Sequence, residues 1–206
     1  MSLESIFTDR KGTIMSKKAV CFPGIGYHCD KPLLHYSRHI ANSLGYGNSQ
    51  NIAYTYSAGN IRGNDEKMKE TYDALFSQTE AELSDIDWTE YDDILFISKS
   101  IGTIIAVSYA KKYGLKDARH ILYTPLAQTY SFAPDNAIGF IGTADPWSSV
   151  NEITRLSAEH HIPLFTYEGC DHSLECEDTL RNIEILKDVI GKAGKFIERP
   201  SICHFS

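Results

Sequence analysis

A serine stands between a strongly apolar segment and a segment with helical periodicity. The run from Ile97 to Thr103 reads ISKSIGT and follows directly on the apolar residues Ile94–Ile97. A serine on a sharp strand-to-helix turn presents its hydroxyl above a sheet, and it needs small residues two positions before and after it so that strand and helix can approach. Ser98 and Gly102 occupy those positions. Taken alone, the pattern is equally consistent with a serine that caps a helix.

Two more reactive side chains follow later strand-like segments. Asp145 lies in the run GTADPW after Ala137–Ile141, and His172 lies in EGCDHS after Pro163–Tyr167. The carboxyl ends of parallel strands form one edge of a sheet, where ligands and catalytic groups collect. A serine, an imidazole and a carboxylate at that edge could perform nucleophilic acyl transfer, because the imidazole can take the serine proton while the carboxylate orients the imidazole.

The elements that must position these groups alternate along the chain. Short β-branched and aromatic runs alternate with segments of 3.6-residue periodicity, which predicts an α/β fold: a three-layer α/β/α sandwich with a mostly parallel sheet of about six to seven strands. The predicted strands are Lys18–Phe22, Asn51–Tyr56, Ile94–Ile97, His120–Tyr123, Ala137–Ile141 and Pro163–Tyr167. The predicted helices are Leu33–Leu44, Asp65–Leu83, Ile101–Lys112, Ser149–His160 and Thr179–Phe196. Residues 1–16 form either an edge strand or a loose extension.

Composition and charge limit the class of protein. We expect one domain over residues 1–206, because 42% hydrophobic residues suffice for one core and no linker-like stretch interrupts the chain. The net charge of −7 argues against nucleic-acid binding. No segment suits a signal peptide or a membrane span, so we expect a cytoplasmic protein without a membrane contact. The five scattered cysteines favour free thiols; they are Cys21, Cys29, Cys170, Cys176 and Cys203.

The order Ser100, Asp145, His172, each after its own strand, resembles the α/β-hydrolase superfamily. The similarity runs from about Lys18 to Phe196. Ser98 departs from the superfamily pattern G-x-S-x-G, which has glycine at that position. The resemblance implies that Ser100 is a nucleophile, His172 its base and Asp145 the acid that orients this base. It implies hydrolysis of a small ester or thioester through an acyl-enzyme, without a cofactor.

The resemblance also predicts the surroundings of the serine. One oxyanion donor is expected to be the N–H of Ile101, and the other that of Ile25 or Gly26, in the glycine-containing loop after the first strand. Lids of this superfamily are commonly inserted after the strand that ends here near Pro125, and the short connection to the next strand leaves no room for one. We therefore expect an open pocket for a small acyl substrate. The expected border residues are Tyr27, His28, Leu126, Tyr130 and Trp147.

Two alternatives for the function are left open by the residues. The same scaffold could be a non-catalytic binding protein with a vestigial set of catalytic residues, or an acyltransferase with an acceptor other than water. The chain is similar to the compact dienelactone-hydrolase-like branch, although those enzymes often use a cysteine where this chain has Ser100. Asp171 and Glu168 are rivals of Asp145, but neighbours in sequence reach an imidazole poorly.

Two other kinds of site are not expected. Gly24-Ile25-Gly26 could begin a dinucleotide fingerprint, but Cys29 stands where the third glycine belongs. Cys170, His172 and Cys176 are close in sequence, yet their spacing matches no common zinc pattern and a fourth ligand is not evident. We therefore predict neither a nucleotide site nor a metal site.

Overall fold

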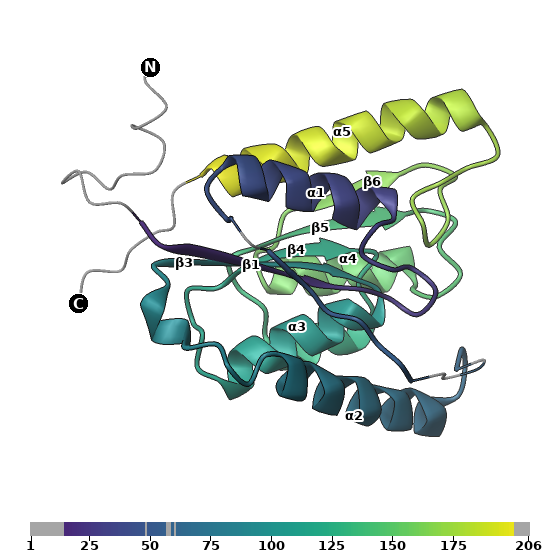
Figure 1. Ribbon diagram of the computed structural model, residues 1–206. Coiled ribbons are helices and arrows are strands. Elements are labelled where there is room, and N and C mark those ends of the chain that lie inside the picture. Colours follow the sequence, from purple (N-terminus) through teal and green to yellow (C-terminus); the bar gives the residue numbers. More distant parts are fainter. Residues whose placement is uncertain (1–14, 48, 57–58, 60, 200–206) are drawn as a thin grey trace, which may run out of the picture.

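The computed structural model describes residues 15–47, 49–56, 59 and 61–199 (Figure 1). Its centre is a six-stranded sheet in the order β2-β1-β3-β4-β5-β6, in which all neighbouring strands are parallel. The strands are β1 (Lys17–Phe22), β2 (Gln50–Asn51), β3 (Asp93–Lys99), β4 (Arg119–Tyr123), β5 (Ala137–Gly142) and β6 (Leu164–Tyr167). The predicted α/β fold with a parallel sheet is confirmed.

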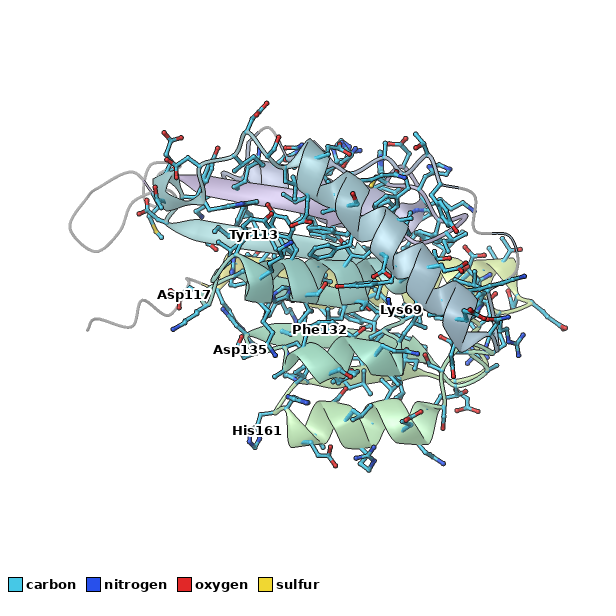
Figure 2. All side chains as sticks on the ribbon, turned by 90° about the horizontal axis from the view of Figure 1, so that it is seen from below. Lys69, Tyr113, Asp117, Phe132, Asp135 and His161 are labelled. Carbon is cyan, nitrogen blue, oxygen red and sulfur yellow. The ribbon has the colours of Figure 1, made fainter. Side chains whose placement is uncertain are left out.

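Helices cover both faces of the sheet. One face carries α1 (Pro32–Ser43) and α5 (Thr179–Glu198). The other carries α2 (Asp65–Glu82), α3 (Ile101–Lys112) and α4 (Val150–Glu159), with the short 3-10 helices η2 (Trp88–Glu90) and η3 (Ala127–Phe132). Figure 2 looks onto this second face and labels Lys69 on α2, Phe132 at the end of η3 and His161 just beyond α4. The sheet is therefore the middle of three layers.

The central strand β3 shows why the sequence adopts this arrangement. All seven of its residues are buried, as expected for a strand of a parallel sheet with helices on both faces. Because successive side chains alternate between the faces, Leu95 and Ile97 pack with α1 and α5, whereas Ile94 and Phe96 pack with α2 and α3. The strand ends where Ser100 leaves the extended conformation.

One predicted strand is wrong over most of its length. Asn51–Tyr56 was expected to be extended and paired, but only Gln50 and Asn51 form β2. Beyond Ile52, backbone N–H groups are hydrogen-bonded to side chains of α2 instead of to a neighbouring strand. Glu82 accepts from the N–H of Ala53 at 3.2 Å, and Gln78 accepts from the N–H of Thr55 at 2.9 Å. The chain therefore leaves the sheet and follows α2.

The other predicted helices and strands lie within two residues of the observed bounds at each end. A possible edge strand over residues 1–16 falls almost entirely outside the described residues. The described cysteines Cys21, Cys29, Cys170 and Cys176 are free thiols, and Cys203 lies outside the described part. Among the helices that the structure describes, none combines the length and the apolar character that crossing a membrane requires.

A buried ion pair joins α5 to the amino ends of the central strands. Arg119 and Asp93 are 2% and 3% exposed, and Nε and Nη2 of Arg119 each lie 3.2 Å from a carboxylate oxygen of Asp93. Tyr46 donates its hydroxyl to Asp93 at 2.6 Å. Arg119 also donates to the carbonyl oxygens of Phe196, Ile197 and Arg199, at 2.9, 3.1 and 2.7 Å. A single guanidinium thus binds the end of the last helix to β3 and β4.

Candidate active site

Ser100 occupies a strained turn between β3 and α3. Its backbone angles are φ 56° and ψ −127°, a conformation that is costly for a residue with a side chain and is concentrated at functional sites. Gly102 makes the turn possible, because a Cβ at that position would lie 2.3 Å from the carbonyl oxygen of Phe22. Ser98 replaces the first glycine of the superfamily pattern without difficulty, since its hydroxyl donates to the carbonyl of Ile121 at 2.9 Å.

A continuous chain of hydrogen bonds joins the three residues that the sequence singled out. His172 Nε2 lies 2.7 Å from Ser100 Oγ, and His172 Nδ1 lies 2.8 Å from Asp145 Oδ2. Since an ionised carboxylate only accepts, Nδ1 carries the proton and Nε2 is left to accept from the serine hydroxyl. The second oxygen of the buried Asp145 carboxylate accepts the backbone N–H of Trp147 at 2.8 Å.

The two rival carboxylates make no such contact. Asp171 accepts the backbone N–H groups of Ser173 and Glu175, at 2.7 and 3.1 Å, and thereby shapes the turn around His172. Glu168 is exposed. Among the described residues, Asp145 is the carboxylate that is hydrogen-bonded to the imidazole.

The acid and the histidine are carried by two loops that are bonded to each other. We call residues 143–147 the acid loop and residues 168–173 the histidine loop. Backbone N–H groups of Thr143 and Ala144 donate to Tyr167 and Cys170, both at 2.9 Å, and Gly169 donates to the hydroxyl of Thr143 at 2.8 Å. At the base of the acid loop, a Cβ on Gly142 would lie 2.1 Å from the carbonyl oxygen of Cys170. This close approach requires glycine.

A small pocket of about 150 Å³ lies beside the serine. Its walls are formed by Ile25, Gly59, Ile61, Met68, Ser100, Ile101, Leu126, Trp147 and His172. The rings of Trp147 and His172 stack with centroids 5.5 Å apart. Leu126 and Trp147 were expected at the border of the site, whereas Gly59, Ile61 and Met68 were not. These three come from the β2–α2 connection and the start of α2, which the sequence alone did not place near the serine.

Two residues at this pocket have a backbone N–H without an acceptor among the residues that the structure describes. Ile101 begins α3, so its N–H has no partner within the helix. Ile25 lies in a turn closed by two hydrogen bonds of 3.2 Å between Gly24 and Tyr27, and its own N–H donates to none of the described residues. Gly26, the alternative donor, has φ +72° and lines an adjoining hollow with His28 rather than the pocket at Ser100.

Three of the expected border residues lie elsewhere. Tyr27 is buried, and its hydroxyl accepts the N–H of Leu33 at 3.1 Å. His28 points into solvent with 68% of its side chain exposed. Tyr130 is buried against α4, where its hydroxyl is hydrogen-bonded to Ser157 at 2.6 Å. The connection that holds Tyr130, residues 124–136, is described throughout and contains only η3, so no lid is inserted between β4 and β5.

Burial sets the charge state of the imidazole. It lowers the pKa of His172 from the usual 6.5, and the nearby charge of Lys99 lowers it further, while the hydrogen bond to Asp145 acts in the opposite direction. The lowered pKa favours the neutral imidazole, which is the form of His172 that can accept a proton. Within the described residues no group of three or more histidine, cysteine, aspartate or glutamate side chains is placed to hold a metal ion.

Comparison with known structures agrees with this fold. No protein-family model matches the sequence, and no curated protein sequence is significantly similar to it. A lidless α/β serine hydrolase from Xanthomonas campestris is 14% identical with a TM-score of 0.57, covering 97% of this chain and 88% of that one. An esterase from Pyrococcus furiosus is 12% identical with a TM-score of 0.55, covering 90% and 83%. An α/β serine hydrolase homologue from Coxiella burnetii is 15% identical with a TM-score of 0.51, covering 86% and 84%. The chain therefore has the fold of the α/β-hydrolase superfamily.

Proposed function

We propose that this protein is a serine hydrolase that cleaves a small ester or thioester through an acyl-enzyme on Ser100. The observation that carries the proposal is the hydrogen-bonded series Ser100–His172–Asp145, with distances of 2.7 and 2.8 Å, at the wall of a pocket. The names of the similar structures, which include serine hydrolases and an esterase, support it.

In the proposed reaction Ser100 Oγ attacks the substrate carbonyl while its proton passes to Nε2 of His172. The resulting imidazolium is stabilised by the buried carboxylate of Asp145. The carbonyl π electrons move onto oxygen, and in this proposal the N–H groups of Ile101 and Ile25 stabilise the negative charge. Collapse of the intermediate expels the alcohol or thiol, which takes the proton from His172. Water then attacks the acyl-enzyme by the same route and releases the acid.

A fluorophosphonate probe tests the nucleophile directly. We expect the folded protein to be labelled once, with peptide mapping by mass spectrometry placing the adduct on Ser100. Labelling should disappear in Ser100→Ala and fall strongly in His172→Ala, because the hydroxyl is a weak nucleophile until a base takes its proton. Ser98→Ala is the matched control, since the Ser98 hydroxyl is hydrogen-bonded to the carbonyl of Ile121 on the neighbouring strand. This variant should be labelled to the same extent as the native protein. A folded native protein that is not labelled would instead be a non-catalytic scaffold.

The size of the pocket predicts the substrate range. A volume of about 150 Å³ is below that of most small-molecule sites and fits a group about the size of benzene. Among p-nitrophenyl esters we expect acetate and butyrate to be preferred over octanoate by about 10-fold or more in kcat/KM. Met68→Ala, which enlarges the pocket, should narrow this difference, whereas Lys67→Ala on the exposed side of α2 should not. A native preference for octanoate would contradict the proposed small-acyl substrate.

A further inference from the structure

We infer that Lys99 is a positioning residue of the proposed active site, whose buried ammonium acts through its charge on the imidazole of His172 without touching the substrate. The inference rests on the proposed role of His172 as the base that activates Ser100. Lys99 ends β3 directly before Ser100, and only 2% of it is exposed. It is absent from the described residues that line the pocket. Lysines are almost never buried so fully unless they are paired.

The side chain of Lys99 lies beneath the turn Gly24–Tyr27. A Cβ on Gly24 would lie 3.5 Å from Lys99 Cδ, and Lys99 Nζ lies 4.9 Å from the centre of the Tyr27 ring. The face of an aromatic ring attracts a cation at this distance. No hydrogen bond or ion pair joins Nζ to another of the described residues. The ammonium is therefore held by packing and by the ring, and no carboxylate in direct contact cancels its charge.

The charged groups around Lys99 come from several segments. Burial lowers the pKa of Lys99 from 10.5 to about 7; Asp145 and Asp171 oppose this change, and Lys31 adds to it. In the other direction, the charge of Lys99 lowers the pKa of His172, which Asp145 and Asp171 raise. Below pH 7 the protonated form of Lys99 is favoured, so its charge acts on His172 in mildly acidic solution.

The direction of this interaction favours the proposed chemistry. A cation near the imidazole destabilises the imidazolium, so more of His172 is neutral in mildly acidic solution than would be without Lys99. The buried carboxylate of Asp145 alone would raise the pKa of His172 and protonate more of the base. Lys99 thus extends the activity of Ser100 to lower pH while contributing no atom to the reaction.

The pH dependence of kcat/KM tests the inference, because its acid limb reports the pKa of the base in the free enzyme. Lys99→Met keeps an unbranched stem under the turn and removes the charge, so we expect the acid limb to move up by at least about 0.5 pH unit. Lys99→Arg retains the charge and should keep the native acid limb. Lys31→Met is the matched control: Lys31 Nζ lies 5.5 Å from the centre of the same ring but is exposed, and its removal should leave the acid limb in place.

The outcomes separate this inference from the proposed function. An unchanged acid limb in a folded, active Lys99→Met variant would overturn the role of Lys99 and leave the hydrolase intact. A native protein that neither reacts with the fluorophosphonate nor hydrolyses esters would overturn the hydrolase itself. Should Lys99→Met fail to fold, NMR titration of the native His172 ring protons decides. Their signals should change again near pH 7, where Lys99 loses its proton, and a titration in a single step would contradict the inference.

Discussion

Replacing Asp145 with asparagine should lower kcat/KM for p-nitrophenyl acetate by about 10⁴-fold at pH 7. The carboxylate has two acceptor oxygens in use, one for the N–H of Trp147 and one for Nδ1 of His172. Asparagine offers one acceptor, and the fixed backbone N–H of Trp147 will engage it. The amide NH₂ then faces Nδ1, which must accept, so that Nε2 carries the proton and can no longer take one from Ser100.

The matched control for this variant is Glu168→Gln. It removes one carboxylate from the histidine loop, but the Glu168 side chain is exposed and makes no hydrogen bond to the imidazole. We expect it to keep activity within a few fold of the native protein. Thermal unfolding of both variants shows whether a loss of activity is accompanied by a loss of folded structure. If folded Asp145→Asn lost less than about 10-fold, Asp145 would not be the acid of the site.

Replacing Arg119 with methionine should lower the free energy of unfolding by about 3–5 kcal/mol. The substitution leaves the carboxylate of Asp93 buried without its cation, and three carbonyl oxygens at the end of α5 lose their donor. Urea unfolding, followed by circular dichroism, measures the change. Lys116→Met is the control, since Lys116 is exposed close by and its loss should cost less than about 0.5 kcal/mol.

A second substitution locates the origin of that loss. In Arg119→Met, much of the penalty comes from the unpaired charge that is left behind, so adding Asp93→Asn should recover part of the stability. The variants should keep near-native labelling of Ser100 while folded, because the ion pair lies at the amino ends of the strands and the serine at the carboxyl ends. A loss below about 1 kcal/mol in Arg119→Met would show that this ion pair does not hold α5 to the sheet.

The fold followed from the sequence because local patterns in this chain agree with its tertiary structure. The apolar run at β3, buried on both faces, and the periodic helix Ile101–Lys112 leave few alternatives for the turn between them. The meeting of Ser100, Asp145 and His172 was predictable as well, since parallel strands bring their carboxyl ends to one edge. The error at Asn51–Tyr56 arose because the acceptors of that segment are side chains of α2, far along the chain.

The walls of the pocket were harder to predict. Met68 belongs to an amphipathic helix whose direction across the sheet no local pattern fixes. Tyr27 follows the glycines of the turn, as a residue at the border of a site would, yet its ring is buried, with Nζ of Lys31 and Lys99 at 5.5 and 4.9 Å from the ring centre. Lys99 carried a signal that could have been used. It directly follows the apolar run Ile94–Ile97 and Ser98 on a strand that is buried on both faces, and a buried lysine requires an explanation.

The bonded acid and histidine loops have a consequence for protein engineering. Because Gly142 leaves no room for a side chain beneath Cys170, and two hydrogen bonds join the two loops, each loop forms part of the scaffold of the other. A histidine loop transplanted alone from another hydrolase would meet an acid loop shaped for a different backbone. Crossover points for chimeras therefore belong before β5 and after the histidine loop, so that Asp145 and His172 are inherited together.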